Sequence, residues 1–189
     1  IAAPHGGLEE AADIADRTYG VFERDINTQD MARRMVAEIY ARTGKRPHLI
    51  MSLIHRRKLD PNRDIVVAAQ GDPNAEIAWN EYHGAIATAR ASAESNFGFG
   101  LLVDTHGHGH TIQRIELGYV VRSEELDLSD QQLEHPAYAE NSSCRTHAHL
   151  PGVHFPSFLR GPRSLGALFV ARGYPAVPSS DMSSPAGAA

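Results

Sequence analysis

The spacing of apolar residues predicts two long helices. The first opens at Asn27 or Thr28, where an N-cap residue is followed by an acidic residue in the first turn, and it ends at Gly44. Its apolar stripe comprises Met31, Met35, Val36, Ile39 and Tyr40. The second follows from "GDPNAEIAWNEYHGAIATARASAE", with Asp72 as the N-cap and Pro73 at the first helical position. Both predictions depend on the 3.6-residue period of a helix.

Three apolar runs between and around these helices predict strands. They read "IAA", "PHLIMSLI" and "GFGLLVD", and none alternates with polar residues, as is typical of strands buried on both faces. The order strand, helix, strand, helix, strand favours an α/β domain with a parallel sheet. A later helix is expected from Ser164. With no repeat and no internal linker, the pattern predicts one domain over residues 1–189.

Both ends of the sequence have unusual features. The chain opens on Ile1 within a predicted strand, and it closes in "PSSDMSSPAGAA", which has the composition of a loop. We therefore expect that a leader or lead-in strand has been removed and that a C-terminal segment is missing. The compartment and the oligomeric state stay open.

Composition excludes several classes of protein. The formal net charge is -5, and the charges are mixed in sign without a basic block, so no nucleic-acid partner is expected. No apolar stretch approaches the ~18 residues of a membrane span. The single cysteine, Cys144, excludes an internal disulfide and a cysteine-only zinc site.

Histidines gather where the third predicted strand ends. In "LVDTHGHGH", His106, His108 and His110 would share one face of a strand, where they need partners or a metal. His5 follows the first predicted strand, and Arg63 lies in the loop after the second. Because ligands of parallel sheets bind beyond the carboxyl ends of the strands, we expect a site at this edge.

Several motifs together resemble the N-formylglutamate amidohydrolase family. They are "APHGG", "LDPNRD", "WNEYH", "VDTHGHGH", "IELGY" and "LRGPRSLGALFVARGYPAVPS", which span nearly the whole chain. That family is related to zinc carboxypeptidases and to zinc N-acetylmuramoyl-L-alanine amidases. The resemblance implies a three-layer αβα fold with a mostly parallel central sheet. It also implies one zinc ion and hydrolysis of N-formyl-L-glutamate to formate and L-glutamate.

The resemblance implies His5 and His106 as zinc ligands. A hydrolytic zinc ion takes three protein ligands and leaves one position for water. For the third ligand we prefer Asp25 in "RDINTQDMA", which matches the acidic position of the family, with Glu10 second and Glu9 as a further alternative. Asp25 could instead be only a helix N-terminal acid. His108 and His110 are expected to hydrogen-bond beside the metal.

Arg63 and Asn62 are expected to bind the carboxylate of the small-molecule N-acyl amino acid substrate, since a guanidinium matches a carboxylate with two parallel hydrogen bonds. The alternative is an arginine that pairs with a nearby loop aspartate. The resemblance adds His83 as a site residue, and Arg160 is a further candidate for a second carboxylate. Arg56 and Arg57 are expected to be solvated or structural.

The acid–base group is the least defined part of the site. Within the chain, Glu116 and Asp104 are the candidates, although Asp104 better fits a carboxylate that orients a ligand histidine. In proteins of this kind the base is a glutamate beyond the segment that corresponds to "YPAVPSS". Two alternatives therefore stay open: a metal-binding module without turnover, and a zinc carboxypeptidase or cell-wall amidase that acts on larger substrates.

Overall fold

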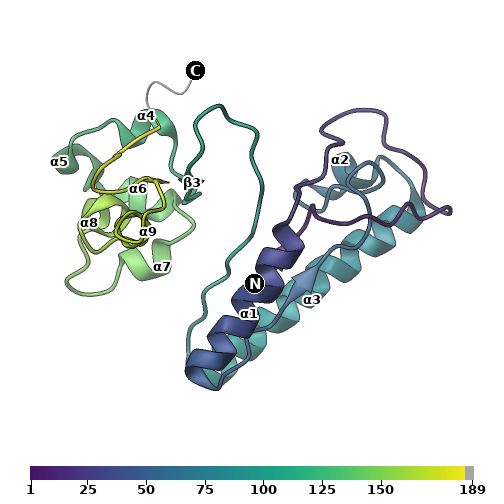
Figure 1. The fold of residues 1–189 in the computed structure, drawn as a ribbon, viewed down its shortest axis with the longest axis horizontal. Coiled ribbons are helices and arrows are strands. Elements are labelled where there is room, and N and C mark those ends of the chain that lie inside the picture. The colour runs from purple at the N-terminus through teal and green to yellow at the C-terminus, as the bar shows by residue number, and fades with distance from the viewer. Residues whose placement is uncertain (186–189) are drawn as a thin grey trace. The chain divides into compact units, whose positions relative to one another are not determined.

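The computed structural model describes residues 1–185, which form two compact units (Figure 1). The first unit is Ile1–His108 and the second begins at Gly109. The division falls inside the histidine- and glycine-rich run, where the sequence shows no linker. That residues 1–189 act as one domain stays a prediction.

The first unit contains two short strands and three helices within residues 1–108. In chain order they are β1 (Ala2–Ala3), α1 (Thr28–Thr43), β2 (Ile50–Met51), α2 (Ile65–Ala69) and α3 (Pro73–Phe97). The two long helices predicted from apolar spacing are confirmed as α1 and α3. The short α2 was not predicted, because five residues are too few to show a helical period.

β1 is the centre of a small parallel arrangement. It pairs with β2 in the register Ala2 to Ile50 and Ala3 to Met51. On its other side Ala2 forms a parallel bridge with Asp104, and the N–H of Ala2 donates to the carbonyl of Val103 at 2.8 Å. Since all three segments run in the same direction, the loops after them emerge at one edge, as predicted.

The third predicted strand is wrong for most of its length. Phe99 and Leu101 are exposed, at 77% and 85% of their surface, although "GFGLLVD" reads as a buried strand. Only Val103 to Thr105 hydrogen-bonds with Ala2. β1 is two residues long, so its backbone pairing with this segment covers only Val103 to Thr105. The apolar side chains before Val103 therefore have no neighbouring strand among the described residues to cover them.

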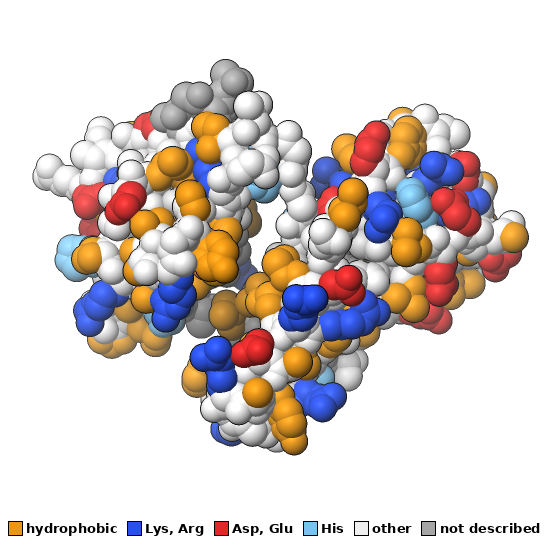
Figure 2. Space-filling model, viewed as in Figure 1, with side chains coloured by type: hydrophobic (Ala, Val, Ile, Leu, Met, Phe, Trp, Pro, Cys, Tyr) orange, Lys and Arg blue, Asp and Glu red, His pale blue; other side chains and the backbone are white. Residues whose placement is uncertain are grey.

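The apolar stripe predicted for α1 is buried on one side only. The buried positions are Thr28, Ala32 and Val36, whereas Met31 and Tyr40 are exposed. α1 packs over β1, whose small alanines and short length provide a narrow surface, and the rest of the stripe stays at the surface. Figure 2 shows hydrophobic side chains among the charged ones on this part of the molecule.

α3 begins as its sequence predicts. The Asp72 carboxylate accepts hydrogen bonds from the N–H groups of Asn74 and Ala75, at 2.9 and 3.0 Å. Pro73 occupies the first turn, where its missing N–H costs nothing. The start of α3 packs on a core formed by Ile14, Leu59, Ala68, Ala69 and Ala75.

The second unit is built mainly from short helices. Its elements among the described residues are β3 (Ile115–Glu116), α4 (Ser123–Leu126), α5 (Asp130–Leu133), α6 (Pro136–Asn141), α7 (Arg145–Ala148), α8 (Phe155–Arg160), α9 (Leu165–Val170) and β4 (Ala176–Val177). Its core comprises Leu126, Leu133, Ala139, Phe155 and Leu159. β3 and β4 are parallel. The helix expected from Ser164 is confirmed, because the Ser164 hydroxyl accepts from the Ala167 N–H at 3.2 Å.

The described residues therefore combine helices with small parallel sheets, which agrees with the prediction of a mixed α/β protein. Among residues 1–185, no helix combines the length and apolar composition needed to cross a bilayer.

Candidate metal centre

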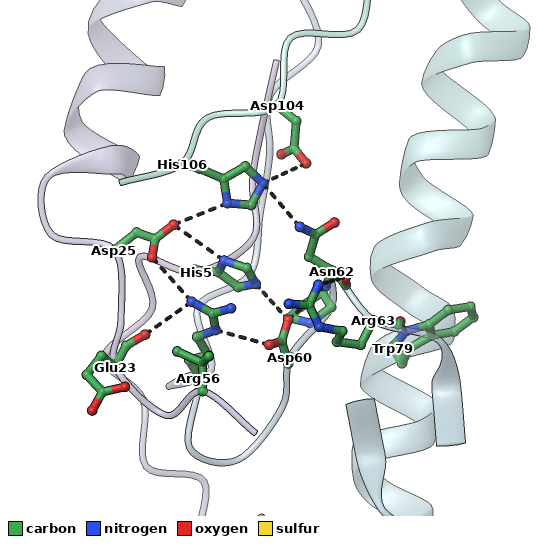
Figure 3. Close-up of polar contacts among 12 residues, drawn as sticks. His5, Glu23, Asp25, Arg56, Asp60, Asn62, Arg63, Trp79, Asp104 and His106 are labelled. Carbon is green, nitrogen blue, oxygen red and sulfur yellow. Dashed lines mark hydrogen bonds and ion pairs between the residues drawn. The ribbon is translucent and has the colours of Figure 1, made fainter. Parts of the chain in front are cut away.

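His5 and His106 lie side by side at the edge where β1 ends (Figure 3). His5 follows β1 and is buried, while His106 follows the bridge between Ala2 and Asp104 and is partly exposed. Their ring centroids are 4.9 Å apart. The convergence of these two histidines, predicted from separate strand ends, is present in the structure.

Asp25 joins the two histidines through a single oxygen. Its Oδ2 lies 3.4 Å from Nδ1 of His5 and 3.2 Å from Nδ1 of His106. The backbone fixes this position, since the Asp25 N–H donates to the His5 carbonyl at 2.9 Å and the Gly107 N–H donates to Oδ2 at 3.0 Å. Of the acids proposed as third ligand, the structure brings Asp25 to the histidines.

Each histidine has a second carboxylate on its far nitrogen. Nε2 of His5 lies 2.7 Å from Oδ1 of Asp60, and Nε2 of His106 lies 3.1 Å from Oδ2 of Asp104. A carboxylate that holds one ring nitrogen fixes the tautomer and leaves the other nitrogen as a metal ligand. Both rings are thus arranged to present Nδ1 to the same point.

This arrangement requires a positive charge between the rings and Asp25. With the proton on Nε2, a neutral ring would direct the Nδ1 lone pair at the carboxylate oxygen, which is unfavourable. Nδ1 of His5 is buried and has no hydrogen-bond partner among the described residues. An added proton or a bound cation would satisfy these atoms.

The pKa values of Asp25, Asp60 and His106 lie far from their ordinary ranges. Burial alone would raise the pKa of Asp25, but contacts with His106, His5 and the Gly107 N–H outweigh it and lower that pKa. The pKa of Asp60 is lowered in the same way, against burial, by His5 and Arg56. Asp104, and then Asp25, raise the pKa of His106 to about 9. The metal-free site therefore holds a proton on His106 at neutral pH.

The three residues fit a zinc ion. One ligand atom from each of His5, Asp25 and His106 lies within 4.8 Å of the others. A tetrahedral ion with metal–ligand distances of about 2.0–2.1 Å separates its ligand atoms by about 3.3 Å, close to both Nδ1–Oδ2 distances. Two imidazoles and one carboxylate are also a donor set that zinc hydrolases use.

Two glycines allow the chain to pack closely around the histidines. A Cβ on Gly7 would come within 2.3 Å of the backbone of Leu53 and Ile54, so no side chain fits there. A Cβ on Gly107 would lie 3.3 Å from the Cβ of Asp25. The glycines of "HGG" and "THG" thus allow His5, His106 and Asp25 to lie close to the neighbouring backbone.

Arg56, Asp60 and Arg17 form a buried charged layer that sequence reasoning missed. Arg56 Nε lies 3.1 Å from Oδ2 of Asp60, and its Nη1 lies 3.4 Å from Oδ1 of Asp25. Arg17 Nη1 lies 3.9 Å from Asp60. The expectation of a solvated Arg56 is wrong, whereas a structural role fits. Asp60 stands between the apolar residues Leu59 and Pro61, which is a sign in the sequence that it could be buried. No apolar pair flanks Arg17 in this way.

Asn62 and Arg63 lie next to the cluster, as expected for substrate binding. The Asn62 amide nitrogen is 3.4 Å from Nε2 of His106. Arg63 Nη1 donates to the Asn62 carbonyl at 2.9 Å. Within residues 1–185 Arg63 forms no ion pair, so the alternative of pairing with a nearby aspartate is not found.

His83 contacts the loop rather than the cluster. Its Nε2 lies 2.9 Å from the Pro61 carbonyl, and its ring packs on Trp79 with centroids 3.9 Å apart. Trp79 Nε1–H donates to the Arg63 carbonyl at 2.9 Å. These two α3 side chains hydrogen-bond with the backbone of 61–63, next to Asn62 and Arg63, and a direct role of His83 in substrate binding stays a prediction.

Two acids considered as alternative metal ligands, Glu10 and Glu9, have other partners. Glu10 lies 3.9 Å from Nε2 of His55 and 3.7 Å from Nη1 of Arg57, and it is not part of the His5 cluster, because the preceding Glu9 pairs with Ile54 in the segment that follows β2. This corrects Glu10 as the second choice of ligand. The backbone of Glu9 hydrogen-bonds with Leu53 and His55 in that same segment.

Glu116 and Arg160 belong to the second unit. Arg114 Nε donates to Glu116 at 3.0 Å, and Nδ1 of His110 lies 3.0 Å from the same carboxylate. Arg160 Nη2 donates to Asp130 at 2.7 Å and to the Leu128 carbonyl at 2.7 Å. The guanidinium of Arg160 is therefore engaged in joining short helices, and substrate binding by it stays a prediction.

Comparison of the chain with family models, with curated proteins and with solved structures gave no match. The functional interpretation consequently depends on the geometry and on the motifs.

Proposed function

We propose that this protein is a zinc-dependent hydrolase that cleaves the amide bond of an N-acyl amino acid such as N-formyl-L-glutamate. One observation carries the proposal. Nδ1 of His5 and Nδ1 of His106 face the same oxygen of Asp25, and a carboxylate holds the far nitrogen of each ring. The resemblance of the motifs to N-formylglutamate amidohydrolases agrees with this chemistry.

The proposal includes a three-layer αβα fold like that of zinc carboxypeptidases. Its support is the central place of β1 between β2 and the Asp104 segment, with α1 packed on β1 and α3 on β2. In such folds the reactive groups lie beyond the carboxyl ends of the strands, where His5, Asn62 and His106 are found.

Each residue has a defined part in the proposed reaction. A zinc ion held by His5, Asp25 and His106 would polarise the acyl carbonyl and lower the pKa of water. Asn62 and Arg63 would bind the substrate carboxylate and so place the amide carbon at the site. Water adds to the acyl carbon while the C–N bond breaks, and a proton reaches the leaving amine. With N-formyl-L-glutamate the products are formate and L-glutamate.

Asp104 is the group nearest to the cluster that could move this proton. Its carboxylate is partly exposed, at 39% of its surface, and contacts His106 Nε2 through Oδ2. A partly exposed carboxylate beside a ligand histidine can orient that ligand and exchange a proton with the site.

A second candidate is a metal-binding module without turnover. One observation favours it: among residues 1–108, Asp25, Asp60 and Asp104 are the carboxylates in contact with the two histidines, and each already holds a ring nitrogen. In this case Asp104 would orient His106 and no acid–base group would act. A zinc carboxypeptidase or cell-wall amidase on larger substrates would share the metal centre and differ in the substrate.

Zinc content and formate release, measured on the same preparation, test the proposal. We expect one zinc ion per chain and release of formate from N-formyl-L-glutamate. Zinc without hydrolysis of any acyl-amino acid would support the binding module. Preference for peptides or muropeptides would support a zinc carboxypeptidase or a cell-wall amidase. Absence of zinc binding would refute all three.

A further inference from the structure

Arg56 is a buried cation placed between two carboxylates of the metal centre. Its exposed fraction is 8%, compared with the half-exposed side chain of its neighbour Arg57. Its Nε donates to Oδ2 of Asp60 at 3.1 Å, and its Nη1 donates to Oδ1 of Asp25 at 3.4 Å. Figure 3 shows the guanidinium between these carboxylates, and Nη1 also donates to the Glu23 carbonyl at 3.4 Å.

The guanidinium decides which oxygen of each carboxylate is directed at the histidines. Asp25 gives Oδ1 to Arg56 and Oδ2 to both rings. Asp60 gives Oδ2 to Arg56 and Oδ1 to His5. A planar group with several N–H donors in fixed directions can hold two carboxylates at once, which a lysine ammonium cannot do with the same geometry.

Arg17, the other buried arginine within residues 1–108, does not duplicate this contact. Its Nη1 donates to the carbonyls of Val21 and Arg56, both at 2.9 Å, and is 3.9 Å from Asp60. Among residues 1–185, Arg56 is the cationic side chain other than histidine in contact with Asp25.

We propose that Arg56 is a positioning residue: it holds Oδ1 of Asp25, so that Asp25 offers a metal ion one oxygen rather than two. The inference rests on the proposed zinc site. A bound ion would then keep a low coordination number and an open position for the substrate. Without Arg56, Oδ1 of Asp25 would lose this donor and could also bind the ion.

Metal binding and cobalt absorption test this role in the whole chain. We compare the wild type with Arg56→Met, Arg56→Lys and the control Arg57→Met, which removes an exposed arginine next to it. Zinc affinity is measured by competition with a chelator. Co²⁺ is then bound alone, because its visible absorption is stronger in four-coordinate sites than in sites with more ligands.

We expect Arg56→Met to weaken zinc binding about 10–100-fold, the range found for groups that orient metal ligands. Its Co²⁺ absorption should be weaker than in the wild type. Arg56→Lys should recover part of the affinity and not the full spectrum, because its single ammonium cannot hold both carboxylates. Arg57→Met should match the wild type in both measurements.

Several results would overturn the inference. Wild-type affinity and spectrum in a folded Arg56→Met protein would do so, and so would a fully wild-type spectrum in Arg56→Lys. If Arg56→Met does not fold, the double variant Arg56→Gln with Asp60→Asn removes the unbalanced buried charge. A spectrum identical to that of Asp60→Asn alone would then overturn it. Failure of the wild type to bind zinc would instead refute the proposed function.

Discussion

Histidine–carboxylate pairs occur in two regions of this molecule, with similar distances and very different surroundings. In the second unit, Nε2 of His149 lies 3.3 Å from Glu140, and Nδ1 of His154 lies 3.2 Å from Glu134. At the metal centre, Nε2 of His5 lies 2.7 Å from Asp60. The exposed fraction is 49% for the His149 side chain and 2% for that of His5.

The difference shows that burial and the second ring nitrogen matter more than the distance. The pairs on the surface leave one nitrogen to water, and solvent and salt screen them, so such pairs contribute little. At the metal centre both nitrogens of His5 face carboxylates, and water is excluded. A buried imidazole between two carboxylates needs a positive charge at the ring, and a bound cation would supply it.

Removal of a proposed ligand should have the largest effect. We expect His5→Ala to weaken zinc binding by more than about 100-fold, beyond the range for residues that only orient ligands. His149→Ala, which removes a histidine paired on the surface, is the matched control and should bind zinc as the wild type does. Chelator competition measures both. Equal zinc affinities of the two variants would contradict a special role for the buried His5.

Loss of charge on Asp60 should have the next largest effect. Asp60→Asn keeps the shape but no longer accepts the proton of His5 Nε2 with a full charge, so zinc affinity should fall about 10–100-fold. The corresponding change in the surface pair, Glu140→Gln, should leave the affinity unchanged. The same titration measures both. An unaffected Asp60→Asn would mean that the buried pair supports folding only.

The pH dependence of zinc binding should report the proton on His106. Because its pKa is raised to about 9, zinc must displace a proton at neutral pH. Zinc affinity should therefore increase with pH, by up to about tenfold per pH unit between pH 6 and 8. His106→Gln, which does not titrate, should give a lower affinity with a flatter profile. A flat profile in the wild type would contradict a protonated His106.

The stability of the metal-free protein should have the opposite dependence on pH. The folded-state pKa of His106 lies above its ordinary value of 6.5. Its contribution is therefore complete below about pH 6.5 and is lost as the pH rises through about 9. Thermal unfolding with a chelator present should show a decrease over this window, and His106→Gln should reduce it. A stability that rises with pH in both proteins would contradict this assignment.

The smallest effect is expected for the residues that hold the 61–63 loop. His83→Ala removes one hydrogen bond to the Pro61 carbonyl, worth ~1 kcal/mol, so KM for an acyl-amino acid should rise about fivefold. Zinc affinity should stay unchanged, because His83 does not contact the cluster. Steady-state kinetics with a parallel zinc titration measures both. A loss of zinc would place His83 at the metal instead.

The sequence predicted the parts of this structure that depend on local chemistry. The caps at Asp72 and Ser164 and the end of α1 at Gly44 follow from hydrogen bonds within a few residues. His5 and His106 were found because each follows a parallel strand, and such strand ends meet at one edge. Asp25 was identified by the resemblance, and the short contacts to both rings agree with it.

The parts that depend on distant contacts could not be predicted. An arginine at position 56 has the same local sequence whether it is exposed like Arg57 or buried between Asp25 and Asp60. Phe99 and Leu101 are exposed because no strand within residues 1–185 lies beside them, since β1 pairs only from Val103 onward. His83 shows the same limit, since its contact with Pro61 spans 22 residues of chain.

One small residue sets the spacing of the proposed ligands. Ala2 lies opposite Ile50 of β2 on one side and hydrogen-bonds with the Val103–Thr105 stretch on the other, with Thr105 N–H donating to its carbonyl at 2.9 Å. Adjacent strands lie about 4.8 Å apart, and the two imidazole rings are separated by 4.9 Å. The distance between the two imidazole rings thus matches the spacing of the paired backbone segments that carry them. A slip of one residue along it would shift His106 by about 3.3 Å and turn its ring to the opposite face.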